Sequence, residues 1–260
     1  MTAPPPGPPP PGVPGPPPGP SFPPWPPAYP APYPSPAYGM PTPPPAERVR
    51  MAWQRRAETD YRFDFWTALG WTILTCGFYS LYVTYQLVRR SRDHNDRRLE
   101  LLDAATTLAW QRAEAGGLAG ELQPNFNRVA AELSVLRHQG AQFRDPALWT
   151  LLSILGGVVH VILLILLNGD LVDHDRAEGA IEHELSIIYT RLGAAVPAPD
   201  PSRMNGRHNY VGRIVATVLT GGIYLFWWVY DTMTEGNEHY DHNWRWEDAL
   251  AASVQQLATV

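Results

Sequence analysis

The sequence predicts an all-α integral membrane protein with about three glycine-centred membrane helices, each followed by an amphipathic helix, and a disordered proline-rich N-terminal tail. Two observations predict this class. Three runs without a charged residue, 66–88, 147–167 and 214–230, reach or approach the length that crosses a hydrocarbon core of roughly 30 Å as a helix. A glycine also stands near the middle of each run, within a set of features that recurs three times.

The N-terminal tail, residues 1–46, holds 24 of the 29 prolines and no charged side chain. Proline fixes φ and removes a backbone donor, so this tail is expected to be disordered or in extended polyproline II conformation. Two roles fit such a segment. It is a solvated spacer, or it is a ligand for a protein that recognises proline-rich sequences.

Charge, cysteine content and the absence of enzyme motifs exclude several classes of partner, site and activity. The formal net charge is −5, all 20 basic residues are Arg and no basic block occurs, so nucleic acid is not an expected partner. Cys76 is the only cysteine, which excludes a disulfide within the chain and a multi-cysteine metal site. The chain also lacks the short motifs of serine hydrolases, zinc proteases and nucleotide-binding loops. We therefore expect no catalytic activity and no cofactor.

The remaining chain divides by composition into membrane and polar segments. Helical spacing of Leu101, Ala105 and Leu108, with a Gly pair after them, indicates an amphipathic helix behind the first membrane run. The expected order is an amphipathic lead-in at the membrane border (47–65), repeat 1 (66–116), a soluble helical arm (117–146), repeat 2 (147–193), a Pro-rich linker (194–209) and repeat 3 (210–260).

The internal repeat becomes visible when the first unit is shifted by 80 and by 145 residues. Central glycines, an acid-His pair and the apolar positions of the following helix then coincide. The matched sets are Gly77, Gly157 and Gly222; His94, His174 and His239; Asp93, Asp173 and Glu238; Leu101, Ile181 and Trp246; and Ala105, Leu185 and Leu250.

The central glycines have two interpretations. Small residues let helix backbones approach closely in lipid, which predicts helix packing at Gly77, Gly156, Gly157, Gly221 and Gly222. Alternatively, each glycine marks a kink or the tip of a re-entrant hairpin. An open turn at bilayer depth leaves peptide groups unsatisfied unless protein or water covers them, so we expect straight or kinked spanning helices.

Spanning helices would make the first and third segments parallel and the second antiparallel to them. Arginines near the segment ends number nine on one predicted side and eight on the other, so the positive-inside rule gives a tie. Re-entrant segments with every loop on one side would produce the same tie. We expect a multi-pass protein of the bacterial inner membrane with its N-terminus in the cytoplasm.

The acid-His pairs are the candidate metal ligands. Imidazole and carboxylate together suit Zn²⁺ or another divalent cation, and the pairs are Asp93-His94, Asp173-His174 and Glu238-His239. If all three segments span, His174 lies on the opposite face and only two of the pairs meet. The alternative is that acid and His mark the hydrated end of each helix.

His160 is the ionisable residue inside the second run. An ionisable group at that depth is by default a functional hypothesis, such as a proton relay or a pore-lining group. Alternatively, it is neutral and hydrogen-bonded to a hydroxyl such as that of Tyr79 or Tyr224.

The Thr-x-Gly-[Phe/Ile]-Tyr core and the helical segment after it resemble an uncharacterised bacterial family of short multi-pass membrane proteins, a domain of unknown function whose segments commonly read T-[L/F]-G-I-Y-x-I-Y-W. The match covers 72–86 and 217–231 well and the second copy poorly, and Cys76 and Phe78 depart from the commonest pattern. The resemblance implies an integral membrane protein and brings no site residues.

These observations favour a non-catalytic, membrane-anchored interaction or scaffold protein. Its expected partners are the lipid bilayer, further copies of the chain and a protein ligand of the tail. The alternative is an oligomeric small transporter or ion- or proton-conducting protein that uses His160 and the acid-His pairs, since three helices are too few to enclose a pathway alone.

Overall fold

The computed structural model describes residues 42–142, 144–201 and 206–258. Every regular element in these ranges is an α-helix, and none of them is a strand. The prediction of an all-α protein is therefore confirmed. The predicted disorder of the proline-rich tail falls on residues that lie almost wholly outside the described ranges.

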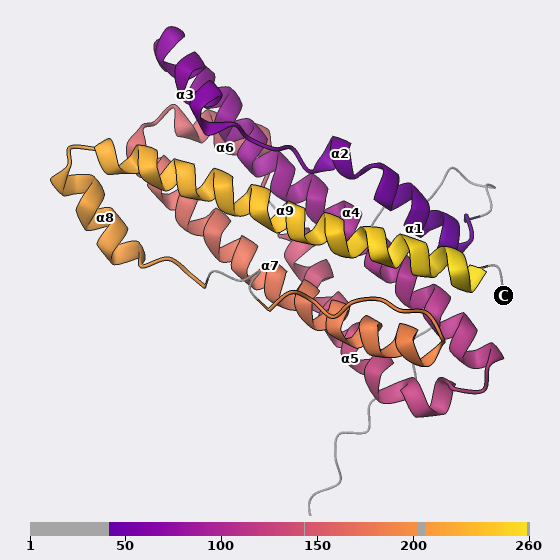
Figure 1. Ribbon diagram of the computed structural model, residues 1–260. Helices are drawn as coiled ribbons and strands as arrows, with labels where there is room; N and C mark the ends of the chain where they lie inside the picture. The colour runs from indigo at the N-terminus through magenta and orange to yellow at the C-terminus, as the bar shows by residue number, and fades with distance from the viewer. Residues whose placement is uncertain (1–41, 143, 202–205, 259–260) are drawn as a thin grey trace, which may run out of the picture. The chain divides into compact units, whose positions relative to one another are not determined.

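Nine helices make up the described residues (Figure 1). They are α1 (Pro45–Gln54), α2 (Arg56–Thr59), α3 (Phe65–Leu74), α4 (Tyr79–Ala115), α5 (Ala119–Ala141), α6 (Pro146–Ser153), α7 (Gly157–Arg191), α8 (Tyr210–Leu219) and α9 (Ile223–Ala258).

Three long helices, α4, α7 and α9, run alongside one another in the same direction (Figure 1). A short helix precedes each of them and folds back on it, so that α3–α4, α6–α7 and α8–α9 are three helical hairpins at one end of the bundle. At the other end, α1 packs against α4 and α9, and α5 packs against α4 and α7.

The three apolar runs do not form single helices, which corrects the expectation of straight or kinked membrane helices. In the first run α3 ends at Leu74 and α4 begins at Tyr79, and the other two runs break at the corresponding place. The chain reverses at each break, as the hairpin alternative expects. The amphipathic helix of each unit is also no separate element, because each long helix continues from the hairpin to the far end of the bundle.

Threonine and glycine together close the hairpin turns. The Thr75 hydroxyl donates to the Trp71 carbonyl and accepts from the Tyr79 amide, at 2.8 and 2.9 Å. The Gly77 amide, at a φ of +93°, donates to the Thr72 carbonyl at 2.7 Å, a helix-ending bond that a left-handed glycine favours. The third turn repeats these bonds at Thr220 and Gly222, whereas the second, which lacks the Thr, closes with shorter-range backbone bonds at Gly156.

Within the described chain the central glycines do not mediate close helix packing, in contrast to the prediction. A Cβ added at Gly77, Gly156, Gly157, Gly221 or Gly222 would meet no other atom within 4 Å. All but Gly157, the first residue of α7, have positive φ. Their backbone conformation, rather than lack of space, requires glycine there. The close approach lies instead at Gly236, where a Cβ would overlap the guanidinium of Arg90.

Equivalent residues of the three repeats form layers along the bundle of α4, α7 and α9. Facing positions alternate in steps of four and three residues, the spacing of parallel helices that wind around one another. On α4 these positions are Ser80, Thr84, Leu87, Ser91, His94, Arg98, Leu101 and Ala105, and shifts of 80 and 145 residues give their partners on α7 and α9. The layers of Leu101 and Ala105 are fully apolar and buried, so they hold the three helices in register.

Large apolar side chains are exposed mainly at the hairpins. Of the 24 exposed large hydrophobic residues among those that the structure describes, twenty lie in 65–82, 146–162 and 210–227. The others are Met51, Tyr61, Val135 and Ile187. Among the described helices, α7 is long and apolar enough to cross a membrane, and α3 and α8 are shorter apolar helices. The hairpin end of the bundle thus exposes more large apolar side chains than the other described residues do.

Replacing Gly77 by Ala should lower the free energy of unfolding by about 1–2 kcal/mol, because its φ of +93° is unfavourable for a residue with a Cβ. Gly70 supplies the matched control. It lies inside α3 with open space around an added Cβ, so Gly70→Ala should stabilise by up to about 1 kcal/mol. Denaturant titration in detergent micelles measures both, and effects of equal sign would contradict the hairpin turn.

Candidate metal centre

Three histidines meet in one buried layer of the bundle. His94 comes from α4, His174 from α7 and His239 from α9, and each follows the central glycine of its repeat by 17 residues. At 1.5 Å per residue the layer lies about 25 Å from the hairpin tips. Because the three helices are parallel, equivalent positions face each other, and all three histidines meet rather than only two.

A carboxylate from the next layer completes the cluster. Glu178 occupies the position equivalent to Arg98 and Asn243, and its Oε1 lies 3.0 Å from His174 Nε2 while its Oε2 lies 3.4 Å from His239 Nε2. His94 Nε2 and His239 Nε2 are 3.2 Å apart. One donor atom from each of the four residues lies within 4.8 Å of all the others, and all four side chains are buried.

The predicted acidic partners are absent from the cluster, which corrects the sequence interpretation. Asp93 pairs with Arg89 and Arg92, and Asp173 pairs with Arg207, while Glu238 is exposed. Adjacent helical residues point about 100° apart, so the residue before each histidine turns away from the bundle axis. The signal for Glu178 was its position four residues after His174, on the same helix face.

Two further carboxylates orient the histidine rings. Asp60, which follows α2, accepts from His94 Nδ1 at 2.9 Å, and Asp175 accepts from His239 Nδ1 at 2.8 Å. A proton held on Nδ1 by a carboxylate leaves the Nε2 lone pair available, the arrangement found behind histidine ligands of metals. Both Nε2 lone pairs therefore face each other across the cluster.

The electrostatics keep the His94 imidazole neutral and the carboxylates of Asp60 and Glu178 charged. Burial lowers the pKa of His94 to about 3. Burial opposes ionisation of Asp60 and Glu178, yet His94 and Arg97 hold the pKa of Asp60, and Arg98 and the nearby histidines that of Glu178, well below the usual range. Neutral imidazole and ionised carboxylate are the forms that bind metal ions.

The facing lone pairs share the Asn243 amide as a donor. The Asn243 amide nitrogen lies 3.3 Å from His94 Nε2, 3.0 Å from His239 Nε2 and 3.0 Å from Glu178 Oε2, but it carries two protons for these three acceptors. Among the described residues, buried His174 Nε2 has no hydrogen-bond partner, although Glu178 Oε1 lies 3.0 Å away. A cation at the centre would satisfy all these atoms.

Buried ion pairs support the cluster from the side away from the hairpins. Arg98 binds Glu178 and Glu182 at 2.6 and 2.5 Å, and it shares Glu247 with Arg97 at 3.1 and 2.8 Å. Five buried carboxylates lie near the histidines, against the two guanidinium groups of Arg97 and Arg98. They are Asp60, Asp175, Glu178, Glu182 and Glu247. A divalent cation would reduce that formal excess of negative charge from three to one.

The donor distances fit a tetrahedral metal ion. Zn²⁺ bonds to histidine nitrogen of roughly 2.0–2.1 Å in a tetrahedron require donors about 3.3 Å apart. His94 Nε2 and His239 Nε2 are 3.2 Å apart, and Glu178 lies 3.0 Å from His174 Nε2 through Oε1 and 3.4 Å from His239 Nε2 through Oε2, all near this value. Oε1 is 4.0 Å from His94 Nε2, and one donor atom from each residue lies within 4.8 Å of the others, so the four side chains would draw closer around an ion. Three imidazoles and one carboxylate are a donor set that suits Zn²⁺.

A small cavity adjoins the cluster on the hairpin side. Its volume is about 20 Å³, and its lining includes the three histidines together with Ser91 and Asp170. A space of this size holds one water molecule. The cavity is too small for an organic substrate.

The predicted intramembrane polar residues lie apart from the cluster. His160 Nε2 lies 3.3 Å from the hydroxyl of Thr84, so its hydroxyl partner is neither Tyr79 nor Tyr224. The Tyr79 ring instead packs against the Tyr82 ring, with centroids 5.2 Å apart and the two planes tilted by 42°, and the Tyr224 amide donates to the Thr220 hydroxyl.

Comparison of the chain with protein-family models, with curated proteins and with solved structures gives no match. The geometry of the cluster is therefore the basis for a function.

Removal of Arg98 should be strongly destabilising. Arg98→Leu would leave Glu178 and Glu182 as buried carboxylates without their guanidinium, so we expect a loss of about 3–5 kcal/mol in the free energy of unfolding. Arg128→Leu is the matched control, because Arg128 pairs with Glu184 from a side chain that is 55% exposed, where a pair contributes at most about 1 kcal/mol. Urea titration compares the two, and similar losses would contradict the buried network.

Proposed function

We propose that this protein is a membrane-anchored, non-catalytic metalloprotein in which one Zn²⁺ ion joins the three repeat units. His94, His174, His239 and Glu178 would hold the ion. The observation that carries the proposal is the burial of three repeat-equivalent histidines in one layer, with carboxylates behind two of them and a fourth donor beside them. The ion would fix the register of α4, α7 and α9.

The donor set supports a structural role for the metal. Four protein donors fill a tetrahedral shell, as in structural zinc sites, whereas catalytic sites keep one position for water or substrate. The adjoining space of about 20 Å³ is far below the roughly 300–1,000 Å³ of small-molecule sites. The resulting rigid bundle would act as an interaction scaffold, and the proline-rich tail would provide a binding segment for a protein partner.

The hairpin end supports membrane anchoring. Leu74, Ile154 and Leu219 occupy equivalent positions at the three turns and are 71%, 63% and 80% exposed. Such a concentration of exposed apolar side chains marks an interaction or membrane surface. The 10-residue arms α3 and α8 are about 15 Å long, half of a hydrocarbon core of roughly 30 Å. The hairpins would therefore enter one leaflet.

Two further features fit insertion into one leaflet. The hydroxyl and amide bonds at Thr75 and Gly77 satisfy the turn internally, which removes the main objection to a turn in lipid. Polar N-caps at Asp64, Asp145 and Asn209 begin the short arms and would mark the membrane border. All polar parts of the chain would then lie on one face, which we assign to the cytoplasm, and the near-equal arginine counts follow.

Purified protein should contain about one zinc ion per chain, because four donors converge on one centre. Elemental analysis by plasma mass spectrometry measures the ratio. His94→Ala, His174→Ala and His239→Ala should each lose the metal. His183→Ala, an exposed histidine on α7, should keep it. Metal-free native protein that also fails to take up zinc after reconstitution would contradict the site.

Asp60→Asn should weaken zinc binding by about 10–100-fold, because an amide no longer holds the Nδ1 proton of His94 as strongly and the ring becomes a poorer ligand. Competition with a chelator of known affinity measures the change. Unchanged affinity would show that Asp60 does not orient a ligand.

The depth of the first turn in the bilayer, and the side of the membrane from which placed cysteines react, test the membrane proposal. A bimane label on Cys76, which is exposed at the first turn, should be quenched by nitroxides deep in the acyl chains and not by aqueous iodide, because the turn would lie in the hydrocarbon core. On a Cys76→Ser background, cysteines placed at Glu114 and His183 should react with an impermeant maleimide from the same side of the membrane. Reaction from opposite sides would support spanning helices instead.

A further inference from the structure

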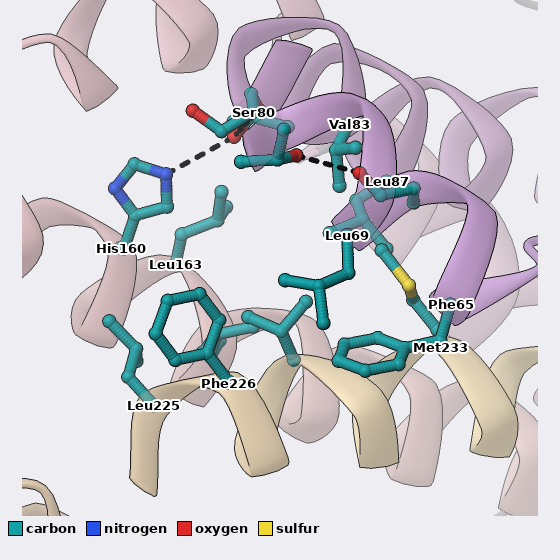
Figure 2. Close-up of a pocket in the computed structure, with 15 residues that line it drawn as sticks. Phe65, Leu69, Ser80, Val83, Leu87, His160, Leu163, Leu225, Phe226 and Met233 are labelled. Atoms are coloured by element: carbon teal, nitrogen blue, oxygen red, sulfur yellow. Dashed lines mark hydrogen bonds between the residues drawn. The ribbon is translucent and has the colours of Figure 1, made fainter. Parts of the chain in front are cut away.

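A second cavity lies on the bundle axis, between the histidine layer and the hairpin turns. Its volume is about 300 Å³, and residues of α3, α4, α7 and α9 line it. Figure 2 shows that its wall is mostly apolar, with Phe65, Leu69, Val83, Leu163, Phe226 and Met233 around the space. It shares no lining residue with the small cavity beside the histidines, so it is a separate site.

The hydroxyl groups in the wall donate to their own helices. Thr72 donates to the Ala68 carbonyl at 2.8 Å, Ser80 to the Gly77 carbonyl at 2.6 Å and Thr84 to the Ser80 carbonyl at 2.9 Å. His160, which lies at the edge of the space in Figure 2, has its Nε2 3.3 Å from the Thr84 hydroxyl. A buried water needs two to four polar partners, and this wall offers few that are not already bonded. The cavity therefore favours an apolar occupant.

The repeat explains why the space exists. The first two layers after the turns combine Ser80 with His160 and Leu225, and Thr84 with Leu164 and Val229. Deeper in the bundle the equivalent layer contains Ala105, Leu185 and Leu250, which are fully buried. Small side chains on α4 near the turns thus leave a volume that close packing would otherwise fill.

We propose that this cavity binds one hydrocarbon chain of a membrane lipid. The inference rests on the proposed membrane placement of the hairpins, because a cavity in that position opens among acyl chains. Its volume is about twice the 150 Å³ at which an engineered apolar cavity already admits benzene. The chain would complete the packing of the hairpin end, independently of the metal ion.

Photo-crosslinking tests the proposal on the full-length protein in phosphatidylcholine vesicles. The probes are phosphatidylcholine and free palmitic acid, each with a diazirine near the end of the acyl chain, and peptide mass spectrometry locates the adducts. We expect adducts at the cavity residues Val83, Leu163 and Met233 in addition to the exposed Leu155 and Leu219. Adducts from the phospholipid alone or from the fatty acid alone would identify the source of the chain.

Filling the cavity should remove the internal adducts selectively. Ala68→Phe places a ring in the space and should reduce adducts at the three cavity residues by about fivefold or more, as a bulkier side chain competes for the same volume. Ile73→Phe is the matched control, because Ile73 is on the same helix, 70% exposed and outside the wall. It should leave the internal adducts unchanged. Leu225→Trp, from α9, is a second filling variant if Ala68→Phe does not fold.

The outcomes separate this proposal from the membrane anchor. Adducts confined to Leu155 and Leu219, or internal adducts that both filling variants leave unchanged, would overturn the acyl-chain site while the anchor stands. Absence of adducts at Leu155 and Leu219 as well would overturn the membrane placement and the acyl-chain site together. Zinc content should not change in the filling variants, since they lie outside the histidine layer.

Discussion

The parallel register of α4, α7 and α9 is the constraint on which the rest of the structure depends. Once three copies of one unit lie side by side in the same direction, equivalent residues meet in layers. Apolar layers such as Ala105, Leu185 and Leu250 hold this register by burial, and a layer of three histidines follows without any further requirement. The buried charges beside it, above all Arg98 with Glu178, would be costly in any other alignment.

The three copies of the repeat differ more in some layers of the bundle than in others. At the histidine layer the three copies are identical, whereas one layer further they are Arg98, Glu178 and Asn243, so a threefold arrangement supplies a guanidinium, a carboxylate and an amide to one centre. Near the turns the copies differ in size, which leaves the apolar cavity of about 300 Å³. The three long helices are arranged symmetrically, but the composition of their layers differs. The same bundle therefore contains both the candidate metal centre and the apolar cavity.

The hairpin turns form the exposed apolar end of the bundle. Thr75 and Gly77 satisfy the peptide groups where the chain reverses, so the turn can be exposed and apolar at the same time. This arrangement separates the exposed apolar end from the buried polar centre by roughly 25 Å of helix. The proposed metal centre and the proposed lipid contacts therefore do not compete for the same residues.

By itself the sequence determined the helical class, the threefold repeat, the three histidines and the places where the chain is apolar. Helical periodicity and repeat spacing are local properties, and they carry this information directly. The tertiary structure decided whether each central glycine continues a helix or reverses the chain, since an apolar run is compatible with both. That reversal makes the three long helices parallel, brings His174 to His94 and His239, and selects Glu178 in place of Asp93, Asp173 and Glu238. Which face of a helix meets its neighbours depends on long-range packing, and no single segment specifies it.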